Sequence, residues 1–222
     1  LADRAGIPAG LFNVVTGTDA KAIGAAMTDS PTVRKLTFTG STPVGKQLLR
    51  QSADTVKKVS MELGGNAPIL IFDDADLDQA VAGALASKYR NAGQTCVCVN
   101  RVLVQDTIYD AFLEKFIAAV ASFRLGDGMD ENNTLGPLVS SKAANDVHSM
   151  VQDAVADGAR VALGGGPAQN LGECFYQPTV LVDVRTDMRV FREEIFGPVA
   201  PVFRFRDEAE AIAMANDTEF GL

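Results

Sequence analysis

The sequence is poor in the side chains that most often bind metals or form disulfides. Its 222 residues include a single histidine, His148, and three cysteines, Cys96, Cys98 and Cys174. So low and odd a number of cysteines argues against a disulfide scaffold and favours a reducing, cytoplasmic setting. A zinc site would use nearly all of these side chains, and their spacing fits no usual zinc-binding pattern, so we expect no metal site. We expect His148 to lie on the surface of a helix.

Basic residues and long apolar runs are also scarce. Lys and Arg number 20 against 28 Asp and Glu, which gives a formal net charge of −8. Because nucleic-acid affinity depends on clustered basic side chains, this balance argues against a nucleic-acid partner. The longest apolar run, residues 67–72, is far shorter than a membrane span, so we expect no membrane partner. The chain opens on Leu1 rather than on Met and stops directly after a helical pattern, which suggests a piece of a longer protein.

The remaining composition, 47% hydrophobic and 22% charged, is that of an ordinary globular chain. Apolar runs bounded by turn residues predict strands at residues 10–15, 33–39, 57–63, 68–72, 101–105, 160–163, 179–184 and 201–205. Helical periodicity and helix-start signals predict helices at residues 20–27, 43–53, 76–89, 108–123, 143–156 and 208–215. This alternation predicts an α/β fold with three layers and mostly parallel sheets. The Gly64-Gly65 pair suggests a boundary between one domain over residues 1–63 and a second over residues 64–222.

A glycine-containing turn follows the second predicted strand. The stretch from Phe38 to Gln47, FTGSTPVGKQ, leads from a strand into a helix, a geometry that presents backbone N–H groups to an anion. Gly40, Gly45 and Lys46 have the spacing of a P-loop, but Gln47 stands where that motif needs Ser or Thr to hold magnesium. We therefore exclude nucleotide hydrolysis, and the G-x-G-x-x-G dinucleotide fingerprint is absent as well. On the residues alone, an anion site and a turn that needs Gly for its backbone freedom both stay open.

Two further stretches carry a carboxylate and a cysteine that could act chemically. Glu62 ends an apolar strand beside Gly64, where desolvation would raise its pKa toward the range of a general base. The alternative is an exposed charged residue at a strand end. Cys96 lies in a polar loop, whereas buried structural cysteines usually have apolar neighbours, and a nucleophilic cysteine needs open access and a lowered pKa. An inert cysteine at a strand start is the alternative, and Cys98 adds the option of a redox pair.

Four motifs follow one another in a fixed order: FTGSTPVG at residues 38–45, MELGG at 61–65, GQTC at 93–96 and EEIFGPV at 193–199. Alone, the last motif predicts only a helix or turn end stopped by Gly-Pro. Together they resemble the aldehyde dehydrogenase superfamily over most of the chain, and Cys96 follows Glu62 by 34 residues, which is similar to the family spacing. The resemblance implies an aldehyde-dehydrogenase-like catalytic lobe preceded by the last part of a Rossmann-like cofactor lobe.

The resemblance also implies site residues and a reaction. Cys96 would be the nucleophile whose thiolate adds to an aldehyde, and hydride transfer to the nicotinamide would then leave a thioester. Glu62 would be the general base that activates water to hydrolyse it. Relatives that pass the acyl group to coenzyme A usually lack this glutamate, so Glu62 favours release of a free acid. The residues that would contact NAD or NADP are Gly40, Ser41 and Gly45 (phosphate to nicotinamide), Leu63 (nicotinamide), and Glu194 and Phe196 (nicotinamide ribose).

Within the superfamily, two stretches resemble the succinate-semialdehyde dehydrogenases: KYRNAGQTCVC at residues 88–98 and NDTEFGL at 216–222. The resemblance implies that Arg90 binds the distal carboxylate of the substrate, a task that suits its planar, bidentate guanidinium. An arginine placed at a helix end by the helix dipole is the alternative. Glutarate semialdehyde and other ω-carboxy aldehydes stay open as substrates, because the depth of the pocket sets the chain length.

The family pattern extends beyond both ends of the chain, so the resemblance implies that part of the cofactor site lies outside it. We therefore expect either NAD or NADP as cofactor, a homo-oligomer for the full-length protein, and no activity for the chain alone. A folded scaffold without catalysis is one alternative function. A thiol-redox module of Cys96 and Cys98 is another, but it lacks the C-x-x-C pattern, so oxidation of Cys98 fits better as a redox switch on the enzyme.

Overall fold

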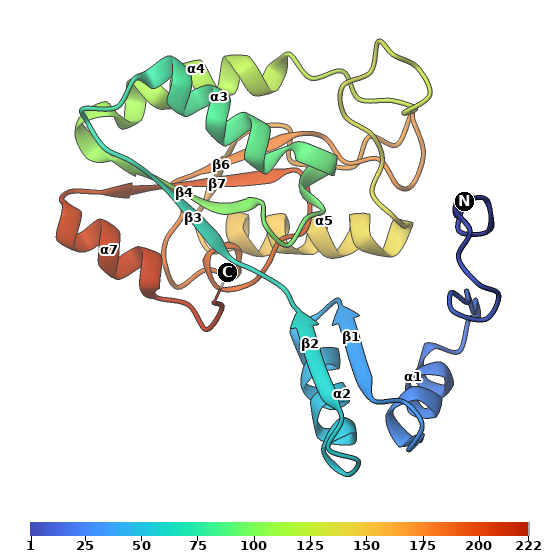
Figure 1. The fold of residues 1–222 in the computed structure, drawn as a ribbon. Helices are drawn as coiled ribbons and strands as arrows, with labels where there is room; N and C mark the ends of the chain where they lie inside the picture. Colours follow the sequence, from blue (N-terminus) through green and yellow to red (C-terminus); the bar gives the residue numbers. More distant parts are fainter. Residues whose placement is uncertain (222) are drawn as a thin grey trace. The chain divides into compact units, whose positions relative to one another are not determined.

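A computed structural model describes residues 1–221 of the chain (Figure 1). Leu222, the last residue of the predicted second domain and of the stretch at 216–222, lies outside the described residues. The chain divides into two compact units, Leu1–Leu63 and Gly64–Leu222. The assignment of these units to cofactor binding and catalysis stays a prediction.

The first unit is a small α/β unit around a two-stranded parallel sheet. Its elements are η1 (Asp3–Ala5), α1 (Ala20–Asp29), β1 (Lys35–Thr39), α2 (Thr42–Ala53) and β2 (Lys58–Glu62). Strand β1 pairs with β2 in a register that sets Thr39 opposite Glu62. Helix α1 begins where the Asp19 side chain accepts the Ala22 N–H, and α2 has Pro43 in its first turn, where its missing N–H costs no hydrogen bond.

The strand predicted at residues 10–15 is wrong. This stretch forms turns and irregular backbone, and Val14 and Val15 are exposed. The residues have strand propensity, but a strand needs a neighbour to pair its N–H and C=O groups, and no strand of the first unit pairs with this stretch in the described residues.

The second unit is built on a five-stranded sheet in the order β3-β4-β7-β6-β5, parallel except for the antiparallel pair β5–β6. Its strands are β3 (Ala67–Ile71), β4 (Val99–Gln105), β5 (Arg160–Leu163), β6 (Thr179–Val182) and β7 (Val199–Phe205). Its helices are α3 (Leu77–Lys88), η2 (Arg90–Gly93), η3 (Asp106–Ile108), α4 (Tyr109–Ala121), α5 (Ser141–Ala156), α6 (Arg189–Arg192) and α7 (Glu208–Asn216). Helices α3 and α4 cover one face of the sheet, and α5 and α7 lie on the other (Figure 1). The predicted three-layer α/β architecture with mostly parallel strands is therefore confirmed, while α6 was not predicted.

The central strand β4 explains why this unit has two apolar layers. Val102 and Val104 point into the large core cluster, and Leu103 points into the second cluster with Phe203 and Ala211. This alternation is the period-two pattern of a strand buried on both faces. No helix within residues 1–221 is long and apolar enough to cross a bilayer, and no three His, Cys, Asp or Glu side chains of this range could share a metal ion.

Candidate active site

The loop that carries Cys96 has an unusual backbone. It leaves α3 through three successive residues in the left-handed region, Asn91 (φ 52°), Ala92 (φ 55°) and Gly93 (φ 74°), and then turns through Cys96 into β4. Left-handed backbone is unfavourable for Ala, so contacts elsewhere must hold this conformation in place. Strain of this kind concentrates at functional sites. Cys96 itself is partly exposed.

Gln94 supplies several of those contacts. Its side-chain oxygen accepts a hydrogen bond from the Val139 N–H at 2.8 Å, and its side-chain nitrogen donates to the Asn91 carbonyl at 3.0 Å. The Asn91 side chain in turn donates to the Gln94 carbonyl at 3.1 Å. The glutamine of the GQTC motif therefore fixes the loop that carries Cys96, the Cys96 loop, internally and ties it to the segment before α5.

The other two cysteines differ from Cys96 in their surroundings. Cys98 is 7% exposed, and its thiol donates to the Gly93 carbonyl at 3.5 Å. Cys174 is partly exposed and lies in the loop before β6. No disulfide joins any of the three cysteines. The structure therefore leaves the predicted redox pairing of Cys96 and Cys98 untested.

Arg90 lies at the start of η2, separated from α3 by Tyr89 alone, and is exposed. Most other arginines of the second unit form ion pairs, such as Arg185 with Asp187 and Arg204 with Asp106. Arg90 forms no ion pair or hydrogen bond with a residue of the described part of the chain. Its guanidinium is therefore available to an external carboxylate.

Glu194 and Phe196, the predicted ribose contacts, follow α6. The half-buried Glu194 carboxylate accepts a hydrogen bond from the Gly65 N–H at 3.1 Å. Burial raises the pKa of Glu194 above its ordinary value, against the opposing effects of the Gly65 N–H and the charge of Lys88. Phe196 has left-handed backbone (φ 50°) and is 43% exposed. Both residues line a cavity of 340 Å³ beside Val147 of α5.

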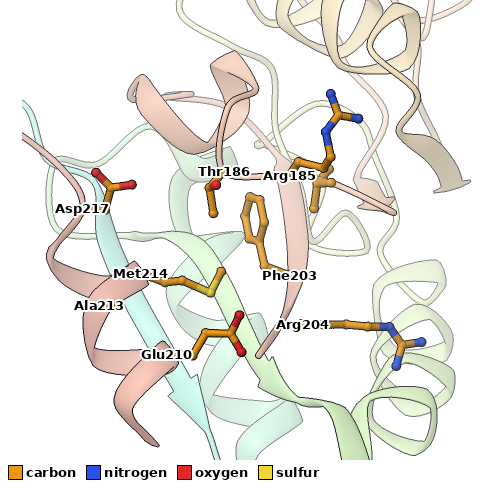
Figure 2. A pocket seen from close by; sticks show the side chains of 9 residues that line it. Arg185, Thr186, Phe203, Arg204, Glu210, Ala213, Met214 and Asp217 are labelled. Carbon is orange, nitrogen blue, oxygen red and sulfur yellow. The ribbon is translucent and has the colours of Figure 1, made fainter. Parts of the chain in front are cut away.

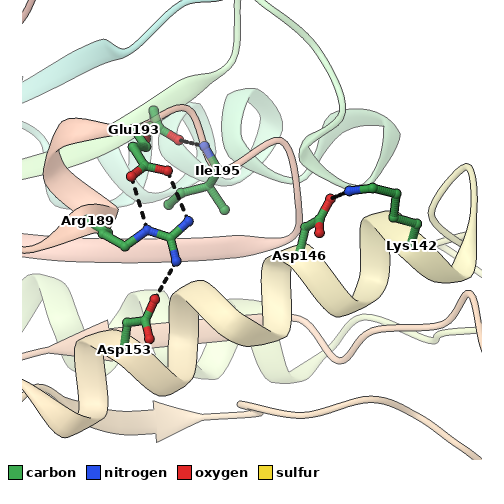
Figure 3. Close-up of polar contacts among 7 residues, drawn as sticks. Lys142, Asp146, Asp153, Arg189, Glu193 and Ile195 are labelled. Atoms are coloured by element: carbon green, nitrogen blue, oxygen red, sulfur yellow. Dashed lines mark hydrogen bonds and ion pairs between the residues drawn. The ribbon is translucent and has the colours of Figure 1, made fainter.

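A network of ion pairs connects this segment to α5 (Figure 3). Arg189 of α6 binds both carboxylate oxygens of Glu193, each at 3.0 Å, and also pairs with Asp153 of α5. These partners raise the pKa of the Arg189 guanidinium above its ordinary value. Because the pairs are partly exposed, each contributes little stability alone. The bidentate geometry nevertheless fixes the direction in which the chain leaves α6.

In the first unit, Gly40 and Gly45 allow close packing rather than anion binding by their own N–H groups. The Gly40 N–H donates to the Glu62 carbonyl at 3.0 Å, and the Gly45 N–H donates to the Ser41 carbonyl at 3.0 Å. A Cβ atom on Gly45 would collide with the side chain of Leu63. The structure thus brings together Gly40 with Glu62 and Gly45 with Leu63.

Ser41 precedes α2 and makes no side-chain hydrogen bond to its first turn. No side chain therefore caps the N-terminus of α2, where the first N–H groups of a helix can bind an anion. Glu62, at the end of β2, is exposed. Its role as a base therefore depends on the resemblance.

Sequence reasoning missed three buried polar residues beside these loops: Asn66, Lys88 and Asn100. The Lys88 ammonium has no hydrogen-bond partner among residues 1–221, and burial lowers the pKa of Lys88. One signal was present, because Lys88 shares the helical spacing of the buried residues Val81 and Ala84. The two asparagines had no such local signal.

Another cavity of the second unit, of 460 Å³, lies between β7 and α7 (Figure 2). Phe203 and Met214 contribute to its wall, together with charged groups such as Arg185 and Asp217. None of the predicted site residues lines it. The volume of a cavity therefore does not by itself identify the candidate active site.

Known proteins resemble this chain in sequence and in fold. The family model described as "Aldehyde dehydrogenase family" matches residues 1–222. The chain is 60% identical to the NADP(+) succinate-semialdehyde dehydrogenase GabD of Escherichia coli K12 and 59% identical to a glutarate-semialdehyde dehydrogenase of Pseudomonas aeruginosa, in each case over 100% of the chain and 46% of the relative. A crystal structure of succinate-semialdehyde dehydrogenase from Burkholderia pseudomallei superposes with a TM-score of 0.97 at 56% identity, over 99% of this chain and 45% of that one. The chain thus spans about half the length of the relatives that it matches. This chain belongs to the aldehyde dehydrogenase family.

Proposed function

We propose that this chain carries the nucleophile of an enzyme that oxidises a carboxylate-bearing aldehyde to the acid with NAD or NADP. The observation that carries the proposal is the packing within the second unit. There the strained loop of Cys96 lies against the segment of Glu194 and Phe196, with the unpaired Arg90 six residues before the cysteine. The proposal concerns the intact enzyme, meaning this chain together with the further segments found in its longer relatives.

The reaction assigns a separate task to each group of the chain. The Cys96 thiolate forms a C–S bond to the aldehyde carbon, and the carbonyl electron pair moves to oxygen, where the backbone N–H of Cys96 stabilises the oxyanion. A bound nicotinamide supplies the two-electron acceptor that converts this adduct to a thioester. Glu62 then takes a proton from water as its oxygen attacks the thioester carbon. The C–S bond breaks, the acid leaves, and the thiolate of Cys96 is restored.

The residues present fit a nicotinamide cofactor. Oε1 of Glu194 is held by Gly65, which leaves Oε2 without a hydrogen-bond partner among the described residues and able to accept from a ribose hydroxyl. Phe196 presents an exposed aromatic ring beside it. The α2 N-terminus after Ser41 offers N–H groups and a positive dipole end to a phosphate. Nothing in these contacts separates NAD from NADP.

The proposed substrate class follows from Arg90. A guanidinium without a partner binds a carboxylate in bidentate fashion. The relatives named for succinate and glutarate semialdehyde act on aldehydes with such a distal carboxylate. We infer that the intact enzyme oxidises an ω-carboxy aldehyde similar in length to succinate and glutarate semialdehyde. Succinate semialdehyde is the first substrate to test. A cytoplasmic location and a homo-oligomeric intact enzyme stay predictions.

The test is a comparison of the intact enzyme with its Cys96→Ala variant and with the isolated chain. The intact enzyme should form reduced cofactor from succinate semialdehyde, and mass analysis of quenched enzyme should find the acyl group on Cys96. The variant should do neither. The isolated chain should be inactive, because the chain spans about half of its relatives' length. A Cys96→Ala enzyme with normal turnover would contradict the proposed role of Cys96. An intact enzyme with no aldehyde oxidation would favour the alternative, a folded scaffold.

A further inference from the structure

A buried pair of asparagine side chains joins the starts of β3 and β4 to the segment around Glu194. Asn66 directly precedes β3 and is fully buried, and Asn100, the second residue of β4, is 2% exposed. The Asn100 Nδ2 donates to the Asn66 Oδ1 at 2.6 Å. Two amides are costly to bury unless their polar atoms are paired. Their partners therefore indicate what the pair does.

Asn100 binds the backbone on both sides of Glu194. Its Nδ2 donates to the Glu193 carbonyl at 3.0 Å, and its Oδ1 accepts from the Ile195 N–H at 3.1 Å. A side-chain amide that both donates and accepts in this way pairs like a strand neighbour. It fixes the peptide groups before and after Glu194, and so the direction in which the Glu194 side chain leaves the backbone.

Asn66 completes the attachment from the other strand. Its Nδ2 donates to the Phe191 carbonyl at 2.9 Å, at the end of α6. The preceding residue, Gly65, donates its N–H to the Glu194 carboxylate at 3.1 Å. Gly65 therefore holds the Glu194 carboxylate, and Asn66 holds the start of the segment that carries Glu194. The backbone carbonyl of Asn66 is held in turn by Arg101, whose Nε donates to it at 3.0 Å.

We propose that Asn100, held by Asn66, is a positioning residue that sets the Glu194 carboxylate for a vicinal diol such as the nicotinamide ribose. This inference rests on the proposed function. Asn100 follows Cys96 by four residues. Strand β4, which begins after the proposed nucleophile, therefore also positions Glu194, the proposed ligand of the cofactor ribose. The Glu194 side chain, with its Oε2 atom, is then already ordered before a ligand binds. Binding therefore does not have to include the entropic cost of ordering it.

The experiment uses the intact enzyme and three variants. Asn100→Ala removes the contacts with Glu193 and Ile195, and Asn66→Ser is the second variant in case the first does not fold. Tyr109→Phe is the matched control, because it removes another buried hydrogen bond, from the Tyr109 hydroxyl to the Val202 carbonyl at 3.0 Å. The readouts are the Kd for NADH and NADPH from nicotinamide fluorescence, the KM values for cofactor and aldehyde, and amide hydrogen exchange at Ile195.

We expect Asn100→Ala to raise the Kd for reduced cofactor by about tenfold or more, because two backbone hydrogen bonds that orient Glu194 are lost. Asn66→Ser should raise it less. The KM for the aldehyde should change by less than about twofold, because the substrate groups are untouched. Exchange at Ile195 should accelerate in both asparagine variants. Tyr109→Phe should lower stability and leave the cofactor Kd unchanged.

An unchanged Kd in Asn100→Ala, with faster exchange at Ile195, would overturn the inference, since the segment would then be loosened without effect on the cofactor. A rise in Kd that Tyr109→Phe shares would also overturn it, as general destabilisation would explain both. If the unaltered enzyme binds neither NADH nor NADPH, the proposed function fails and takes the inference with it. If the unaltered enzyme binds the reduced cofactor and the asparagine variants bind it with the same Kd, the inference fails and the proposed function stands.

Discussion

Gly93 and Gly197 approach each other so closely that a Cβ atom on Gly93 would collide with the Gly197 carbonyl oxygen. Gly93 also has a φ of +74°, which L-residues with side chains rarely adopt. A Cβ on Gly197 would in turn collide with Val147 of α5. The Cys96 loop and the Glu194 segment therefore pack backbone against backbone, and the Glu194 segment packs in turn against a side chain of α5.

Gly93→Ala should disrupt this packing. The left-handed φ and the collision with a backbone oxygen that cannot rotate away should lower the free energy of unfolding by about 1–3 kcal/mol. Urea unfolding of the intact enzyme measures the loss, and turnover should fall with it. Gly83→Ala is the control, because a Cβ there meets nothing within 4 Å and α3 should gain up to about 1 kcal/mol of helix propensity. Equal stability of the two variants would contradict the packing argument.

Most helices and strands could be predicted because their signals are local. Helix α3 begins after Asp76, whose side chain accepts the N–H groups of Asp78 and Gln79, and this aspartate was the start signal in the sequence. Helix α7 begins after Asp207 in the same way. The strand predicted at residues 10–15 failed because strand propensity says nothing about whether a partner lies beside it.

The candidate site could be predicted only where a motif carries it. Cys96, Glu194 and Arg90 lie in stretches that resemble a known family, so their residue numbers followed from the sequence. Asn66 and Asn100 meet each other and the segment near residue 193 across long stretches of chain, and no periodicity encodes such contacts. Long-range hydrogen bonds between loops are thus the part that the sequence leaves undetermined.

Lys88→Met should stabilise the enzyme in a pH-dependent way. Burial lowers the pKa of Lys88 below its ordinary value of 10.5, although Cys98 and Glu194 oppose the shift. Because the folded state disfavours the charged amine, stability is lowest below the folded pKa and rises as the pH climbs through it toward 10.5. The variant removes this penalty, and its advantage over the unaltered enzyme should be largest below the folded pKa of Lys88 and shrink as the pH rises toward 10.5.

Urea unfolding at several pH values measures this difference. Lys142→Met is the control, because Lys142 is exposed and forms a surface ion pair with Asp146 at 2.5 Å. A difference between Lys88→Met and the unaltered enzyme that stays constant across the pH range would show that the Lys88 charge does not matter. A variant less stable at pH 7 would show that the attraction of Glu194 exceeds the cost of burying the ammonium.

Glu62→Gln should slow release of the acid. Glutamine keeps the shape but cannot take the proton of the attacking water, and a general base typically contributes about 10²–10⁴-fold in rate. Rapid mixing with aldehyde and cofactor should show a burst of reduced cofactor followed by a slow steady state. Glu131→Gln, an exposed loop residue of the second unit, is the control. Unchanged steady-state turnover in Glu62→Gln would remove its assignment as base.

Arg90→Ala should raise the KM for succinate semialdehyde far more than the KM for an uncharged aldehyde of similar length. Loss of a charged hydrogen-bond partner for a buried carboxylate costs about 2–5 kcal/mol. Arg124→Ala is the matched control, since Arg124 is also exposed and forms no ion pair with the described residues. Steady-state kinetics with both substrates decide the question. An equal loss for the two substrates would mean that Arg90 supports the loop and not the carboxylate.

Peroxide should inactivate the intact enzyme reversibly through Cys96 and Cys98. One molecule of hydrogen peroxide takes up the two thiol hydrogens and is reduced to two water molecules while the S–S bond forms. The Cys98 thiol must first leave its buried place and its hydrogen bond to the Gly93 carbonyl, so the reaction should be slower than simple alkylation of Cys96. A disulfide across so short a loop is strained, and strained disulfides are easily reduced. Non-reducing mass analysis should find a loss of two hydrogens that a dithiol reverses with recovery of activity. Cys98→Ala should instead oxidise irreversibly at Cys96. Sulfinic Cys96 beside an unmodified Cys98 thiol in the unaltered enzyme would refute the switch.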